Sequence, residues 1–141
     1  MNEVLVTNQK EFKEAFQDRV DKIIVEGRFA KELYALRALQ TAERAVTHEL
    51  LKEQDELEHG SPATFSRMSK VSGLSIEALK LLVYIDLGVV IRFYHTYYFA
   101  EQPKTGEPFH IEFLRNGVEE MLKEAEKKKE TKEKKGKLWR R

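Results

Sequence analysis

Cysteine is absent from this sequence, and proline and glycine are scarce, with three and seven residues among 141. Without cysteine the chain can form neither disulfide bonds nor thiolate metal sites, and this composition is typical of proteins in a reducing compartment. The shortage of proline and glycine leaves long stretches free to form helices. We therefore expect a cytoplasmic protein held together by a hydrophobic core, which a chain of this length is large enough to build.

Long hydrophobic runs are also missing. The most apolar segment lies between Lys80 and Arg92 and is interrupted by Asp86, whereas a membrane-spanning helix needs about 20 apolar residues. The first residues contain no basic stretch followed by an apolar run, so no secretory signal is expected. The sequence thus predicts no transmembrane segment.

An excess of charge of one sign is lacking too, because 25 lysines and arginines oppose 24 aspartates and glutamates. This balance argues against a strongly basic nucleic-acid-binding protein. Residues 119–141 are the exception, with ten basic and six acidic side chains. Because few apolar residues are available there, we expect a charged tail that begins as a helix and loses order, following a single domain over residues 1–118.

Enzyme and metal-site signatures are not found. The sequence contains no glycine-rich phosphate loop and no Gly-x-Ser-x-Gly motif. The histidines do not pair at helical spacing; they are His48, His59, His95 and His110. We therefore expect a non-enzymatic protein without a cofactor or metal ion. The enzymatic alternative is a shallow site made by Asp86, Tyr94 and His95.

The N-terminal part has the pattern of a strand, a helix and a second strand. Val4–Thr7 and Lys22–Gly27 are rich in β-branched residues, and Asn8 with Glu11 three residues later has the spacing of a capping box. A helix over residues 8–20 would connect the strands. Such a crossover predicts that the two strands are parallel.

Residues 28–58 have the composition of one long helix, because they include no proline or glycine. That helix would be roughly 45 Å long, more than a domain of this size requires. It either bends back on the core or packs its far half on a partner chain. In the second case the chain self-associates or binds another protein through a candidate interface of Leu36, Leu39, Val46, Leu50 and Leu57.

Residues 64–83 resemble a helix-turn-helix, the device by which many regulators enter a DNA groove. Ser69, Gly73 and Leu79 occupy the small, turn and locking positions of that motif. A nucleic-acid-binding regulator is therefore an alternative function. A plain helical corner produces the same pattern. The candidate nucleic-acid contacts are Arg67, Lys70, Ser75 and Lys80.

A β-hairpin is predicted near the C-terminal end, with strands at 89–100 and 109–115 and a proline-containing turn at 102–108. Strand alternation would place Arg92, Tyr94, Thr96 and Tyr98 on an outer face. That face could stack a base or bind a peptide, although tyrosines on half-buried strands are common structural residues.

The N-terminal module resembles a small uncharacterised bacterial family. The residues that carry the likeness are Glu11, Phe12, Ala15, the strand Ile23–Glu26 with Gly27, and Ala30. Members of that family often continue into a glycine-rich apolar segment. The resemblance implies a bacterial protein with membrane-proximal or oligomeric behaviour, and the charged composition of residues 28–58 implies a soluble version of it.

Together these patterns predict an α+β fold, in which a small mixed sheet of two N-terminal strands and a C-terminal hairpin packs with helices. The expected function is that of a non-enzymatic interaction or assembly protein that self-associates through its long helix. The alternatives are the nucleic-acid-binding regulator and a peripheral membrane-associated protein.

Overall fold

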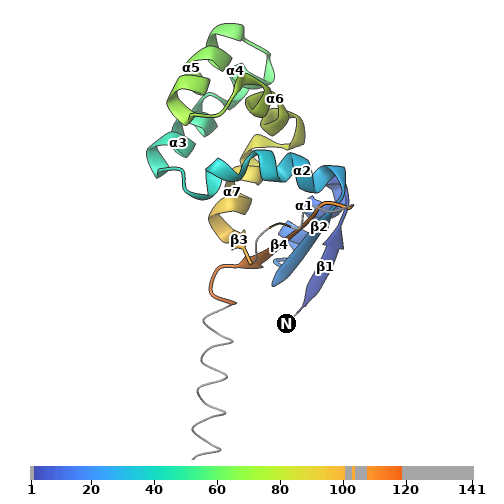
Figure 1. Ribbon diagram of the computed structural model, residues 1–141. Coiled ribbons are helices and arrows are strands. Elements are labelled where there is room, and N and C mark those ends of the chain that lie inside the picture. Colours follow the sequence, from blue (N-terminus) through green and yellow to red (C-terminus); the bar gives the residue numbers. More distant parts are fainter. Residues whose placement is uncertain (1, 101–102, 104–107, 119–141) are drawn as a thin grey trace, which may run out of the picture.

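The computed structural model describes residues 2–100, 103 and 108–118. Within these residues the chain forms seven α-helices, one 3-10 helix and a four-stranded sheet, which confirms the α+β class (Figure 1). The predicted tail at 119–141, and most of the predicted turn at 102–108, lie outside the described residues. The elements in chain order are β1 (Glu3–Val6), α1 (Gln9–Gln17), β2 (Lys22–Glu26), α2 (Arg28–Ala35), η1 (Arg37–Gln40), α3 (Arg44–Lys52), α4 (Gln54–Glu58), α5 (Pro62–Ser72), α6 (Ile76–Ile85), α7 (Leu87–Thr96), β3 (Tyr97–Phe99) and β4 (His110–Arg115).

The sheet has the strand order β1-β2-β4-β3. β1 and β2 are parallel, as predicted, while β4 pairs antiparallel with both β2 and β3. Two N-terminal strands and a C-terminal hairpin therefore build one mixed sheet. β4, the last described strand, lies between β2 and β3, so it pairs a C-terminal segment with an N-terminal strand.

Helix α1 begins where the capping pattern predicts. The Asn8 Oδ1 atom accepts a hydrogen bond of 2.9 Å from the Glu11 backbone N–H. The Glu11 carboxylate in turn accepts 3.0 and 2.7 Å bonds from the backbone N–H and hydroxyl of Thr7, one residue earlier than in a standard capping box. These bonds lower the pKa of Glu11. The N-terminus of α1 is thus fixed by side chains that its own sequence supplies.

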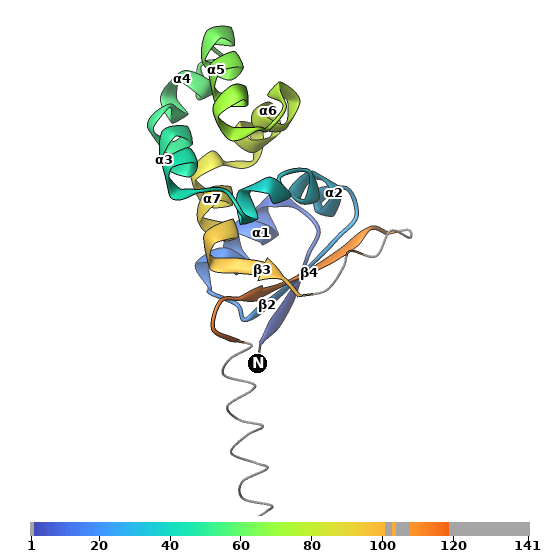
Figure 2. The same ribbon diagram turned by 60° about the vertical axis from the view of Figure 1, so that its left-hand side comes forward.

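The core lies between the helices and one face of the sheet. Ile23, Val25, Ile111 and Phe113 of the two central strands are completely buried on this face. The ring of Phe93 in α7 lies 4.8 Å from those of Phe12 in α1 and Phe113 in β4, measured between centroids. Edge-to-face contacts of this kind add to the stability that apolar burial provides. Figure 2 shows α1, α2 and α7 beside the sheet and α3–α6 gathered in a separate lobe farther from it.

The prediction of one long helix at 28–58 is wrong. The segment forms α2, η1, α3 and α4, with the first interruption at Leu36 and the last at Glu53. Two local hydrogen bonds and one tertiary hydrogen bond satisfy carbonyl groups at the end of α2. The Leu33 carbonyl accepts hydrogen bonds from the Leu36 N–H and the Tyr94 hydroxyl, and the Tyr34 carbonyl accepts one from Arg37 Nη1.

The interruptions fold the apolar side chains of this segment onto the rest of the molecule. A straight rod would extend roughly 45 Å and carry its later leucines away from the core. With the interruptions, Leu36, Leu39, Leu50 and Leu57 are each at most 1% exposed. Burial of a leucine stabilises a fold by about 1.5–3 kcal/mol, which outweighs the few backbone hydrogen bonds lost at each interruption.

The predicted first strand of the hairpin is also corrected. Only Tyr97–Phe99 form a strand, and residues 87–96 form helix α7. The side chain of Asp86 caps this helix by accepting a 3.2 Å hydrogen bond from the Val89 N–H, and its carboxylate lies 3.5 Å from Lys13 Nζ. Tyr94 is therefore a buried helical residue rather than part of an outer strand face.

Candidate interaction surface on helix α6

The four leucines of the candidate oligomer interface lie in the chain's own core. Val46 is partly buried and packs against that core. The sequence assigns these five residues to an interface because a long projecting helix would leave them uncovered. Since the chain itself covers them, that reason no longer holds. Any interaction surface must lie elsewhere on the molecule.

The helical corner predicted at 64–83 is formed by α5 and α6. Gly73 ends α5 in the left-handed conformation with φ of 76°, which costs glycine little because it has no Cβ atom. The Ser75 hydroxyl caps α6 by accepting a 3.0 Å hydrogen bond from the Ala78 N–H. Ser69 donates a 2.7 Å hydrogen bond to the Leu74 carbonyl and fixes the turn against α5.

The inner side of the corner is fully packed. Leu79, at the position predicted to lock the second helix, and the packing residues Met68, Leu74 and Leu82 are each at most 5% exposed. The candidate nucleic-acid contacts lie on the exposed side, but they are modest in charge. Arg67 is paired at 2.9 Å with Glu53, and Ser75 uses its hydroxyl for capping, so Lys70 and Lys80 are the two cations that remain.

Helix α6 is unusually rich in apolar residues for a helix at the surface. Eight of its ten residues are hydrophobic, and Glu77 and Lys80 are the other two. Leu79, Leu82 and Ile85 face the core, whereas Ile76 and Tyr84 are 42% and 74% exposed. Ile76, Lys80 and Tyr84 recur at intervals of four residues and so form one outer stripe, which we call the α6 stripe.

A surface helix normally carries charged and polar residues on the side away from the core. On α6, two of the four exposed residues are Ile76 and Tyr84, and Tyr84 is the most exposed of the large apolar residues that the structure describes. Sequence reasoning treated Lys80 as a phosphate contact and overlooked Tyr84. The signal was present, since IEALKLLVYI contains too many apolar residues for a helix with one buried face.

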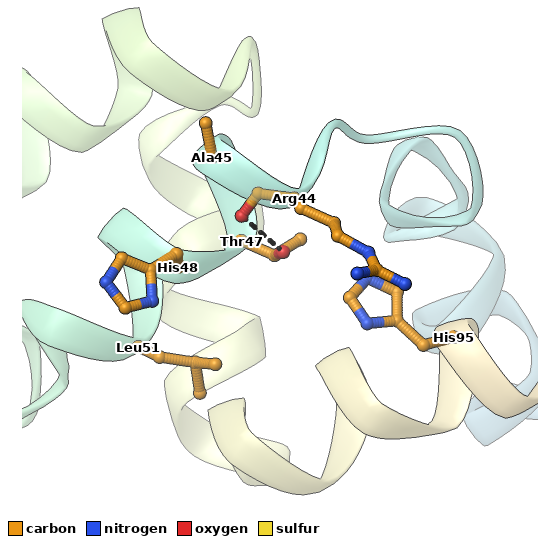
Figure 3. Close-up of a pocket in the computed structure, with 6 residues that line it drawn as sticks. All are labelled: Arg44, Ala45, Thr47, His48, Leu51 and His95. Carbon is orange, nitrogen blue, oxygen red and sulfur yellow. Dashed lines mark hydrogen bonds between the residues drawn. The ribbon is translucent and has the colours of Figure 1, made fainter.

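A second feature is an open pocket of about 520 Å³ between α3 and the end of α7. Figure 3 shows the Arg44 side chain extending toward the His95 ring, while His48 lies at the opposite end beside Leu51. The Thr47 hydroxyl is used internally, donating a 3.2 Å hydrogen bond to the Arg44 carbonyl. The pocket thus presents cationic and imidazole groups, and no carboxylate is among its lining residues.

No group of three or more metal-ligating side chains occurs in the described part of the chain, and none of its helices is long and apolar enough to cross a membrane. Searches against models of protein families, characterised proteins and solved structures find no match.

Proposed function

We propose that this protein is a non-enzymatic interaction protein that docks a partner protein on the α6 stripe. The observation that carries the proposal is the exposure of Tyr84 and Ile76 on a helix whose opposite side is already buried. Covering these two side chains would remove a substantial apolar area from water, at roughly 25 cal/mol for each square ångström. Tyrosine is also enriched among the residues that dominate binding at protein interfaces.

The spacing of the stripe suggests the kind of partner. Ile76, Lys80 and Tyr84 extend over about 12 Å of helix, and anchors at such intervals are typical of a helix that lies in an apolar groove. A second copy of this chain that paired stripe to stripe is a weaker choice, because two convex helix faces cover less of each other than a groove covers of a helix. The partner is therefore expected to present a groove that accepts the tyrosine ring, with an acidic group near Lys80.

Site-specific photocrosslinking tests this proposal in cells that naturally produce the protein. A benzophenone amino acid replaces Tyr84 in one variant and the exposed Leu51 of α3 in a matched control. We expect a crosslinked protein adduct from position 84 that the control does not give and that Ile76→Lys abolishes. Adducts of equal yield from both positions, or none from position 84, would contradict the proposal.

A nucleic-acid-binding regulator is the second candidate, and the specific observation in its favour is that the α5–α6 corner forms with its locking residues buried. Its weakness is that, of the four candidate contacts, Lys70 and Lys80 alone carry a charge that is not paired among the described residues. A gel-shift assay at low salt with Lys70→Gln and Lys80→Gln distinguishes the candidates. Retardation that both substitutions reduce would favour nucleic acid over a protein partner.

A further inference from the structure

A second pocket lies where the end of α1, the last turn of α7 and the end of β4 meet. Its volume is about 460 Å³, within the range of small-molecule sites, and it is more enclosed than the pocket of Figure 3. The residues that line it are Phe16, Gln17, Arg19, Arg92, Thr96, Tyr97, Arg115 and Asn116. This arginine pocket is separate from the α6 stripe, and the inference from it does not depend on the proposed function.

The charge of the arginine pocket is strongly one-sided. Three of its lining residues are arginines and none is acidic, although acidic and basic residues are almost equal in number in the whole chain. Guanidinium groups bind carboxylates and phosphates through paired N–H donors. Because Arg115 is already paired with Asp21, the positive charge that favours an anionic occupant comes from Arg19 and Arg92.

Asp21 holds the Arg115 side chain in place. Its Nη2 atom lies 2.6 Å from Asp21 Oδ1, and its backbone N–H donates a 2.9 Å bond to the Asp21 carbonyl. The Arg115 side chain lowers the pKa of Asp21, so that carboxylate stays ionised. The Nε atom of Arg115 is buried and has no hydrogen-bond partner among the described residues. Asp21 thus fixes the orientation of the Arg115 guanidinium at the wall of the pocket.

Arg19 is held by the backbone at the end of α1. It adopts the left-handed conformation with φ of 51°, which is uncommon for a residue other than glycine. Its N–H donates a 3.2 Å hydrogen bond to the Phe16 carbonyl. This conformation directs the chain sharply away from the helix and leaves an exposed arginine at the rim. Arg92, in the middle of α7, is exposed on the other side; its Nη2 atom lies beside Gly88, so the side chain must turn toward the pocket to contact an occupant.

The pocket is too large for a bare oxyanion, because its volume equals that of roughly fifteen water molecules. Its apolar wall is formed by the half-buried ring of Phe16, which packs against Tyr97 at 6.3 Å between centroids. We propose that the arginine pocket binds a small organic molecule that carries a phosphate or carboxylate group, with the oxyanion on the arginines and the organic body against Phe16.

Titration with phenyl phosphate tests this assignment, because the compound combines an oxyanion with an aromatic ring. Binding is measured by calorimetry at low salt and by the NMR signals of the arginine Nε–H groups. We expect Arg19→Gln and Arg92→Gln each to weaken binding roughly tenfold, the loss expected for one charge-assisted hydrogen bond. Benzoate and inorganic phosphate show which oxyanion the arginines prefer and whether the ring contributes.

Arg28→Gln is the matched control, since the Arg28 side chain is 94% exposed on α2 and does not line the pocket. Arg115→Lys keeps a cation beside Asp21 and tests the planar guanidinium without leaving that carboxylate unpaired. Benzyl alcohol should not bind, because it lacks the charge. The proposal is overturned if phenyl phosphate produces no shift in the arginine signals, or if the double variant at Arg19 and Arg92 binds it as tightly as the unaltered protein.

Discussion

Two glycines with different backbone conformations show how single residues are constrained here. Gly73 has φ of 76° at the end of α5, where a side chain would be strained whatever space surrounds it. Gly88 has ordinary helical geometry inside α7, and a Cβ atom added there would lie 3.3 Å from Arg92 Nη2, the mobile tip of an exposed side chain. The same substitution should therefore have opposite effects at the two positions.

We expect Gly88→Ala to stabilise the protein by about 0.5–1 kcal/mol, because alanine reduces the conformational freedom of the unfolded chain and favours helix. We expect Gly73→Ala to destabilise it by about 1 kcal/mol or more, because of the left-handed backbone. Urea unfolding followed by circular dichroism measures both. Equal effects of the same sign would contradict the assigned conformations.

The ion pair of Asp21 and Arg115 makes the stability of the folded protein depend on pH. Hydrogen bonding to Arg115 lowers the pKa of Asp21 below its usual 3.8, so the unfolded chain takes up the proton first as the pH falls. The pair therefore contributes its full stability above pH 3.8 and loses it progressively as the pH falls toward the folded-state value.

Asp21→Asn should accordingly lower the melting temperature at neutral pH and leave a smaller difference from the unaltered protein at about pH 3. Asp18→Asn is the control, because Asp18 is exposed at the end of α1 and forms no ion pair in the described part of the chain. A difference between the Asp21 variant and the unaltered protein that does not change with pH would show that the ion pair does not act through this carboxylate.

At the scale of elements, locally determined features could be predicted and tertiary ones could not. The cap at Asn8, the turn at Gly73 and the cap at Ser75 depend on neighbouring residues, and each forms where the sequence places it. The end of α2 depends on the Tyr94 hydroxyl, which is 61 residues away from Leu33 in sequence. No sequence pattern within residues 28–58 predicts the contact with Tyr94.

Helix α7 forms where the sequence pattern predicts a strand, for a related reason. Its β-branched and aromatic residues have high strand propensity, yet propensity is worth little beside burial on one helical face. Val90, Ile91, Phe93 and Tyr94 all lie in the core. The cap at Asp86 was the available helix signal. The α6 stripe was likewise readable, whereas the arginine pocket joins three elements distant in sequence and was not.

Tyr94→Phe tests the tertiary ending of α2. Burial raises the pKa of the Tyr94 hydroxyl, which keeps it protonated as a hydrogen-bond donor to the Leu33 carbonyl. The Leu33 carbonyl keeps its hydrogen bond from the Leu36 N–H in this variant, so it is not left without a partner. We therefore expect the free energy of unfolding to fall by about 1 kcal/mol, the value for one lost hydrogen bond.

Hydrogen exchange should show faster exchange at the end of α2 in this variant. Tyr84→Phe, which changes an exposed tyrosine, is the control and should not alter either measurement. Unchanged stability and exchange in the Tyr94 variant would show that the hydroxyl does not hold the end of the helix.

At the scale of the whole molecule, the segment 28–58 contributes to one shared core rather than to a projecting rod. Leu50→Ala should therefore destabilise the protein by about 2–5 kcal/mol, the range for a buried leucine, and leave its sedimentation behaviour unchanged. Leu51→Ala is the neighbouring control, since that side chain is 37% exposed and should cost much less. A Leu50 variant that dissociated an oligomer without losing stability would restore the interface hypothesis.

The position of β4 in the sheet has a consequence for biosynthesis. His110 pairs with Glu26, 84 residues earlier, so one side of β2 has no partner until nearly all of the described chain has been translated. At typical ribosomal speeds of about 5–20 residues per second, this interval lasts on the order of ten seconds. During it, Ile23 and Val25 are without the strand that later adjoins them, and the nascent polypeptide is at its most vulnerable to aggregation or chaperone capture.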